Sequence, residues 1–236
     1  MFKTEASFVR TITNSVNLDI NKINKINNKE ALFIKKEVCL GYGIADIVVA
    51  KYQKNKATFR NNSLNLFDIS LVRLIRNRKE IDIDEIRRIT KFSNKKINIS
   101  LQKLIEDKII DVKKENFFSF NNYSSILTNS IAIEAKLKNW KRALNQAYRY
   151  KWFAEKSFVF LPKENISPAY KNIHLFKKMN VGLGTISESK ELDILYTPKK
   201  EHPYSEDMWM LLNECILVNL SLISKKTPRK EDDTQN

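Results

Sequence analysis

One stretch, residues 131–150, constrains the fold more than any other part of the chain, because the spacing of its apolar residues changes half-way. Between 131 and 137 apolar residues alternate with others, which predicts a strand with two different faces. From 140 onward they recur every three or four positions, which predicts a helix. The stretch therefore predicts a strand followed directly by a helix. The apolar strand face holds Ile131, Ile133, Ala135 and Leu137, and the apolar helix face holds Trp140, Ala143, Leu144 and Ala147.

The opposite faces of this strand and helix carry polar groups. Glu134 and Lys136 share one strand face. A carboxylate and an ammonium on a half-buried strand lose hydration energy, so their presence there indicates a specific role. Gln146 and Tyr150 are four residues apart and therefore lie on one side of the helix. The outer side chains of the helix are Lys138, Lys141, Arg142, Asn145, Gln146 and Arg149.

An earlier acid, Asp46, interrupts an apolar run. Residues 31–39 and 44–52 are rich in strand-forming types and are separated by Gly-Tyr-Gly, which predicts an antiparallel hairpin with a glycine turn. An aspartate inside such a strand packs poorly and has low strand propensity. Asp46 is therefore either a metal ligand or one partner of a structural salt bridge.

The combination of Asp46, Glu134-Ala135-Lys136 and Gln146-x-x-x-Tyr150 resembles the PD-(D/E)xK nuclease superfamily, in particular its QxxxY-containing branch. Two features depart from the family pattern. Ala45 stands where the family has proline, and about 88 residues separate Asp46 from Glu134 where a short hairpin is usual. The resemblance covers residues 31–52 and 128–197. The ExK motif alone is a weak signal in a lysine-rich chain, and the order of all the motifs makes it more specific.

The resemblance implies the α/β class and a restriction-endonuclease-like core, which is a mixed central sheet flanked by helices. It favours the ligand role for Asp46, which would bind Mg²⁺ or Mn²⁺ together with Glu134 and the main-chain carbonyl of Ala135. Lys136 would act on the attacking water or on the phosphorane. Glu5, on a helix predicted over 3–16, is either a further ligand or an acid favoured by the helix N-terminus. Gln146 and Tyr150 would contact the scissile phosphate or the neighbouring backbone, and the further phosphate contacts would come from Lys138, Lys141, Arg142 and Arg149.

The segment between the two nuclease-like parts has a different pattern. Three apolar-striped helices precede two short strands around residue 115. Asp82 and Asp84 are capping-type residues that lead the second helix, and Ser93 can cap the third. This order, and the run LQKLIEDKIIDVKK, resembles a winged helix-turn-helix inserted over 63–120. The insert would bind DNA or only protein. Its expected DNA contacts are Lys95, Lys96, Asn98, Gln102 and Lys103 on the third helix, whose apolar stripe is Ile97, Leu101, Leu104 and Ile105, and Lys113 and Lys114 on the wing.

The charge of the chain indicates a polyanionic partner. The formal net charge is +15, which favours nucleic acid over an anionic membrane surface, although a lysine-rich proteome would also produce it. The two cysteines and two histidines form no cluster, which argues against a zinc site or a disulfide framework. We expect a cytoplasmic protein with DNA as partner and no membrane association. A homodimer, or other proteins of a DNA-processing system, stays open.

These patterns predict three parts: a discontinuous nuclease-like core over 1–62 and 121–223, the winged-helix insertion over 63–120, and a disordered tail over 224–236. Two functions from different classes fit them. The first is a metal-dependent DNA nuclease whose inserted domain helps to select the substrate. The second is a non-catalytic DNA-binding regulator or assembly factor built on a nuclease fold.

Overall fold

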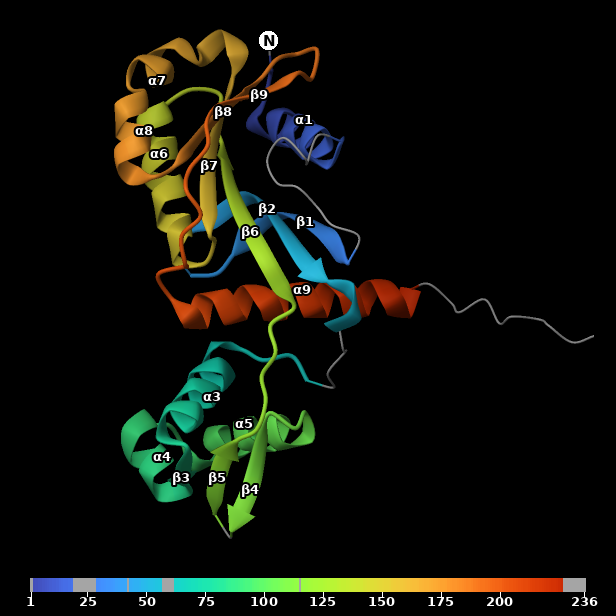
Figure 1. Cartoon of the computed structure of the whole chain (residues 1–236), viewed down its shortest axis with the longest axis vertical. Coiled ribbons are helices and arrows are strands. Elements are labelled where there is room, and N and C mark those ends of the chain that lie inside the picture. Colours follow the sequence, from blue (N-terminus) through green and yellow to red (C-terminus); the bar gives the residue numbers. More distant parts are fainter. Residues whose placement is uncertain (1, 19–28, 42, 57–61, 115, 227–236) are drawn as a thin grey trace, which may run out of the picture. The chain divides into compact units, whose positions relative to one another are not determined.

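The computed structural model describes residues 2–18, 29–41, 43–56, 62–114 and 116–226 (Figure 1). The chain divides into two compact units. Unit 1 comprises Met1–Lys56 and Ile126–Trp209, and unit 2 comprises Ala57–Ser125 and Met210–Asn236. Each unit therefore contains two segments that are far apart in the sequence.

Unit 1 contains a mixed six-stranded sheet in the order β1-β2-β6-β7-β8-β9. The predicted hairpin is present, because β1 and β2 pair antiparallel with Cys39 opposite Ile44. Strand β6 pairs antiparallel with β2 and parallel with β7. The α/β class with a mixed, helix-flanked sheet is thus confirmed. The strands are β1 (Glu30–Cys39), β2 (Ile44–Gln53), β6 (Leu127–Ala135), β7 (Lys156–Pro162), β8 (Gly182–Ile186) and β9 (Leu192–Tyr196).

Helices lie on both faces of this sheet (Figure 1). Helix α1 covers one face, where Phe8 and Ile12 pack in one cluster with Ile131 and Ile133 of β6. Helices α6 and α8 lie on the other face. The helices of unit 1 are α1 (Glu5–Leu18), α6 (Trp140–Arg149), α7 (Ser167–Lys171) and α8 (Ile173–Met179), and its 3₁₀ turns are η1 (Lys54–Lys56), η2 (Tyr150–Trp152) and η3 (Lys163–Asn165).

The change of period in residues 131–150 is confirmed as a strand followed by a helix. Strand β6 ends at Ala135 and α6 begins at Trp140. Asn139 caps the helix: it has a left-handed backbone, which asparagine tolerates, and its side chain accepts a hydrogen bond from the N–H of Arg142. The alternation in β6 therefore places Glu134 on the α6 side of the sheet, opposite the core face that packs against α1.

Within its described residues, unit 2 contains three helices before residue 107, most of the C-terminal helix, and a three-stranded antiparallel sheet in the order β3-β5-β4. Ser93 caps α5, as the sequence predicts. Of the two capping candidates for α4, Asp82 is the N-cap and Asp84 lies in the first turn. Strand β3 was not expected; its three residues pair with β5. The elements are α3 (Leu66–Arg78), β3 (Glu80–Asp82), α4 (Ile83–Thr90), α5 (Asn94–Glu106), β4 (Ile110–Lys114) and β5 (Phe117–Phe120).

Two details of unit 2 differ from the expectations. Ile105 is 38% exposed, because it lies at the edge of the α5 stripe formed by Ile97, Leu101 and Leu104. Helix α9 (Glu206–Lys226) includes the first three residues of the expected tail, and 227–236 lie outside the described residues.

From Met210 onward, α9 belongs to unit 2. Met210 packs in the same apolar cluster as α3 and α5. The Tyr123 hydroxyl lies 2.8 Å from a Glu214 carboxylate oxygen and 3.4 Å from the Met210 carbonyl. The segment from 121 to 125 is therefore tied to α9 as well as to β5.

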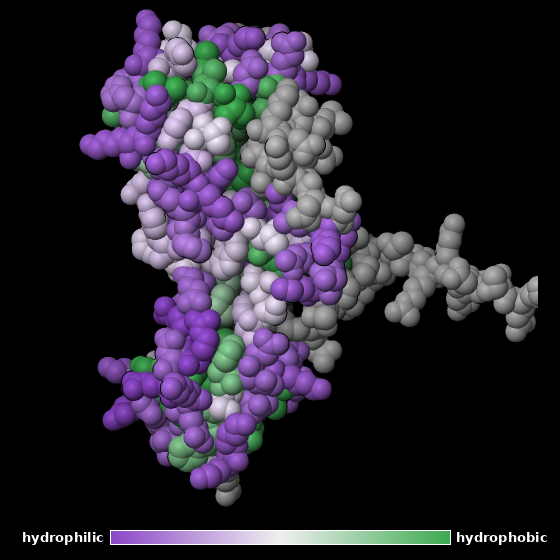
Figure 2. Space-filling model, in the orientation of Figure 1, coloured by the Kyte–Doolittle hydropathy of each residue, from purple (hydrophilic) through white to green (hydrophobic). Residues whose placement is uncertain are grey.

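Most of the described surface seen in Figure 2 is hydrophilic, with smaller apolar areas between the charged side chains. Among the described residues, no helix combines the length and the apolar character that a bilayer crossing needs.

Candidate metal and nucleic-acid site

Asp46 and Ala135 meet where two neighbouring strands part. The regular pairing of β2 with β6 ends at Ile47 and Ile133, so the next residues of the two strands have no ladder bonds between them. The N–H of Ala135 instead donates to the Asp46 carboxylate at 2.7 Å. Because the N–H and C=O of one strand residue point to the same side, the Ala135 carbonyl is also directed toward the β2 side.

Glu134 and Lys136 form an ion pair beside this contact. The Lys136 Nζ lies 3.2 Å from Glu134 Oε1 and 3.2 Å from Glu5 Oε2. The Glu134 side chain is 1% exposed and that of Glu5 is 51% exposed. The first residue of α1 therefore joins the end of β6 through the ammonium of Lys136.

Tyr150 supports Glu134 from the α6 side. Its ring is fully buried, and its hydroxyl donates to the Ile44 carbonyl at 2.7 Å and also contacts Glu134 Oε2. A hydroxyl has only one hydrogen, whereas a carbonyl and an ionised carboxylate both require one. The single hydroxyl hydrogen therefore has two competing acceptors, the Ile44 carbonyl and the Glu134 carboxylate.

Burial and neighbouring charges shift the pKa values of all three ionisable groups at this place. Burial raises the pKa of Glu134, and the negative charge of Asp46 raises it further, against the lowering effects of Tyr150 and Lys136. Burial likewise raises the pKa of Asp46, although the Ala135 N–H opposes the shift. For Lys136, burial lowers the pKa, but the carboxylates around the ammonium raise it more. The two acids are thus costly to ionise unless a further cation joins them.

The donor set suits a hard divalent cation. Asp46 and Glu134 supply carboxylate oxygens and Ala135 supplies a carbonyl, which are the ligand types that Mg²⁺ prefers, with water or phosphate in the remaining positions. Among the described residues, no three His, Cys, Asp or Glu side chains are gathered around one point. Both Glu134 oxygens have hydrogen-bond partners, so a bound metal would replace Lys136 or Tyr150 at one of them.

Gln146 lies one helical turn before Tyr150. Its Oε1 atom is buried and, within the described part of the chain, has no hydrogen-bond partner. An unsatisfied buried amide oxygen is unfavourable, which leaves it available to a water or a ligand. The structure therefore brings Asp46, Glu134, Ala135, Lys136, Tyr150 and Glu5 together and places Gln146 on the same side of α6.

The basic side chains predicted for phosphate contact are exposed on or just before α6. Between Glu134 and Glu155 the sequence has no acid, so no acidic side chain of this segment offsets their charge. They are Lys138, Lys141, Arg142 and Arg149.

Comparison with protein-family models, with curated proteins and with solved structures finds no match to this chain.

In unit 2, α5 and the β4 end of the hairpin present most of the predicted DNA contacts to solvent. The ammonium of Lys96 lies 3.7 Å from the centroid of the Phe92 ring and 4.6 Å from that of Phe67. Gln102 Nε2 donates to Glu106 at 3.0 Å. The exposed members of the set are Lys95, Lys96, Asn98, Gln102, Lys113 and Lys114.

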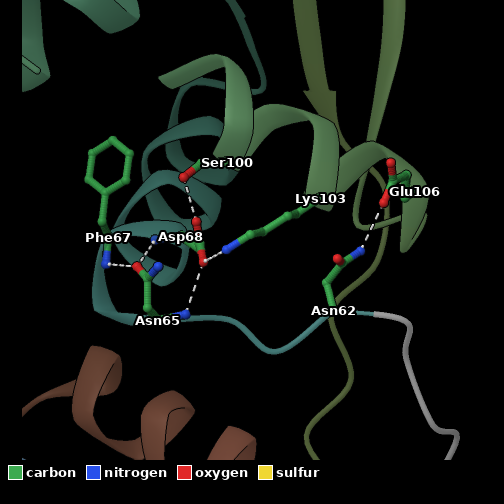
Figure 3. Close-up of polar contacts among 7 residues, drawn as sticks. All are labelled: Asn62, Asn65, Phe67, Asp68, Ser100, Lys103 and Glu106. Carbon is green, nitrogen blue, oxygen red and sulfur yellow. Dashed lines mark hydrogen bonds and ion pairs between the residues drawn. The ribbon is translucent and has the colours of Figure 1, made fainter. Parts of the chain in front are cut away.

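Lys103 differs from the expected outward orientation. Its Nζ lies 3.3 Å from the fully buried carboxylate of Asp68, to which the Ser100 hydroxyl also donates (Figure 3). An unpaired buried carboxylate is unfavourable, so the ammonium points inward. Asp68 also accepts from the N–H of Asn65 in a capping box at the start of α3, a role that the sequence Asn-Leu-Phe-Asp signals.

Proposed function

We propose that this protein is a metal-dependent DNA nuclease. The single observation that carries the proposal is the convergence of Asp46 and Glu134, two acids with raised pKa values, beside Lys136 at one end of a mixed sheet. Purely structural acids in a sheet need one partner each. Here two acids, a carbonyl and an ammonium share one place, which fits the PD-(D/E)xK resemblance and the donor preference of Mg²⁺.

Phosphodiester hydrolysis requires a positioned water, neutralised phosphate charge and a stabilised leaving oxygen. A Mg²⁺ or Mn²⁺ ion held by Asp46, Glu134 and the Ala135 carbonyl would neutralise the phosphate charge and acidify a bound water. The Lys136 ammonium, within 3.2 Å of Glu134, can orient the attacking water or stabilise the phosphorane. Tyr150 fixes the Glu134 side chain, and Gln146 offers an amide to the phosphate or its water.

For unit 2 we propose a DNA-binding winged helix. The order of its elements, helix, short strand, two helices and a β-hairpin, is that of the winged helix-turn-helix. Helix α5 would enter the major groove, and Lys113 and Lys114 would contact the backbone from the hairpin.

Cleavage of supercoiled plasmid, of linear duplex and of branched or single-stranded DNA, with Mg²⁺, Mn²⁺ or EDTA, tests the proposal. We expect cleavage with metal and none with EDTA. Asp46→Asn should abolish cleavage, whereas Asp193→Asn, on an exposed aspartate of β9, should leave it unchanged. DNA binding without cleavage of any substrate by the unmodified protein would instead support the non-catalytic regulator or assembly factor.

A further inference from the structure

Three exposed aromatic rings lie together on the outer side of unit 1. Tyr148 is 39% exposed, Trp152 is 37% exposed and Tyr204 is 49% exposed. The Tyr204 ring centroid lies 6.4 Å from that of Tyr148 and 6.2 Å from that of Trp152, and both pairs are edge-to-face. Large rings exposed in a group, rather than singly, mark a binding surface. We call these three residues the aromatic platform.

The platform is held in place by the backbone and by a buried lysine. The N–H of Tyr204 donates to the Lys151 carbonyl at 3.0 Å, and the N–H of Ser205 donates to the Trp152 carbonyl at 3.2 Å. The Lys151 ammonium lies 5.3 Å from the Tyr148 ring centroid and 5.2 Å from the Tyr204 ring centroid. The charge of Lys151 is balanced by Glu201 at 2.7 Å. The rings are therefore ordered before any partner binds.

The platform continues a polar stripe of α6. One exposed line about 16 Å long runs along α6 and into η2. It consists of Lys141, Asn145, Tyr148 and Trp152, at spacings of four, three and four residues. Arg142 and Arg149 flank this line and are also exposed. Tyr150, between Tyr148 and Trp152 in the sequence, points the other way and contacts Glu134. Around the circumference of the helix, Arg149 and Gln146 lie between this exposed line and Tyr150, which contacts Glu134 in the candidate site.

The chemistry of this stripe identifies its occupant. Exposed aromatic faces accept any nucleic-acid base by stacking, and neighbouring Lys and Arg side chains follow the phosphates. The bases of a duplex are already stacked on each other, so only unpaired bases can reach the rings. The stripe and its edge carry the positive charges of Lys141, Arg142 and Arg149, whereas the negative charge of Glu201 beside the platform is balanced by Lys151. This charge favours a polyanion over a protein surface of mixed charge.

We infer that the aromatic platform and the α6 stripe bind a single-stranded segment of DNA by base stacking. This inference rests on the proposed nuclease function and narrows the substrate to DNA that contains unpaired bases, such as a flap, an overhang or a gap.

The test measures binding of the full chain to a fluorescent 15-nucleotide oligothymidine and to a duplex of the same length, in EDTA so that no cleavage occurs. The double variant Tyr148→Leu/Trp152→Leu keeps apolar side chains but removes two rings. We expect it to bind the single strand at least about tenfold more weakly, because stacking on one ring contributes about that much. Duplex affinity should change less than about twofold.

Two further variants separate stacking from misfolding. Tyr148→Phe/Trp152→Phe retains the rings and should restore single-strand binding. Tyr170→Leu removes an exposed tyrosine of α7, which lies outside the platform, and should have no effect. Equal losses for single strand and duplex, or no loss in the leucine variant, would overturn the inference.

The outcome is independent of cleavage. Ring-dependent binding of the single strand by a protein that cuts no DNA would refute the nuclease proposal and leave the stacking surface intact. Metal-dependent cleavage of duplex DNA by a protein with no ring-dependent single-strand binding would refute only the stacking surface.

Discussion

The main-chain N–H of Ala135 donates to the carboxylate of Asp46 at 2.7 Å, although the two residues are 89 positions apart in the sequence. This bond closes the gap where β2 and β6 stop pairing. It places the carboxylate of Asp46 beside Ala135, which is the residue after Glu134. The Ala135 carbonyl is directed toward the same side as its N–H group. The proposed metal site thus depends on a local departure from regular sheet pairing.

Glu134→Ala and Lys136→Ala should both abolish cleavage for different reasons. Removing Glu134 deletes a charged ligand, so Mn²⁺ affinity should fall. Removing Lys136 deletes a positive charge beside the carboxylates, so Mn²⁺ affinity should hold or rise while the chemical step slows by about two or more orders of magnitude. Calorimetric Mn²⁺ titration and single-turnover cleavage measure the two effects. Undiminished cleavage by Lys136→Ala would exclude that lysine from the mechanism.

Glu134→Gln should change how stability depends on pH. Because the folded-state pKa of Glu134 lies above its usual value near 4.5, folding takes up a proton at this group in the window between the two values. The stability that the wild type gains from Glu134 is complete below the usual pKa and is lost as pH rises through the raised one. The difference in the free energy of unfolding between the variant and the wild type should therefore shift in favour of the variant as the pH rises from 4 to 7. Urea titrations measure this difference. Glu164→Gln, an exposed control, should show no such trend.

Tyr150→Phe should weaken the fold and shift the pH dependence of cleavage. The Ile44 carbonyl loses its hydroxyl donor, which costs about 1–3 kcal/mol of unfolding free energy. The hydrogen bond that lowers the pKa of Glu134 is also lost, so the acidic limb of the pH–rate profile should move to higher pH. Tyr148→Phe, which alters an exposed tyrosine on the same helix, should do neither. An unmoved limb in Tyr150→Phe would separate Tyr150 from the ionisation of Glu134.

Asp68→Ala should destabilise unit 2 strongly. It leaves the buried Ser100 hydroxyl and the Asn65 N–H without their acceptor and removes the partner of Lys103, for a loss of about 3 kcal/mol. Asp84→Ala, which breaks an exposed ion pair with Arg87, should cost less than about 1 kcal/mol. Urea denaturation followed by circular dichroism measures both. A similar small loss for the two variants would mean that the Asp68 network contributes little.

Lys95→Ala and Lys103→Ala should act on different properties. Lys95 is exposed on α5, so its loss should weaken duplex binding and reduce the slope of log affinity against log salt by about 0.9. Lys103 is engaged by Asp68, so its loss should lower stability and leave the salt slope unchanged. Binding titrations at several salt concentrations test this. A reduced slope in Lys103→Ala would show that its ammonium leaves Asp68 for a phosphate.

The sequence by itself determined the local elements. The alternation of 131–137 and the helical spacing from 140 are effects of neighbouring residues on one another, and the observed β6 and α6 follow them. The caps Asp82 and Ser93 each bind a main-chain N–H group three residues later, so the sequence also predicts these helix starts. Local patterns of this kind predict elements because their physical causes lie within one or two turns.

The tertiary structure alone decided which groups meet. The bond from Tyr150 to the Ile44 carbonyl spans 106 positions, and that from Lys136 to Glu5 spans 131. The orientation of Lys103 was decided in the same way, because Asp68 is buried only when α3 and α5 pack together. A lysine on a helix face points inward when a buried carboxylate would otherwise be left unpaired, because an unpaired buried charge is strongly unfavourable. That carboxylate is buried only in the folded chain, so the local sequence does not predict this orientation.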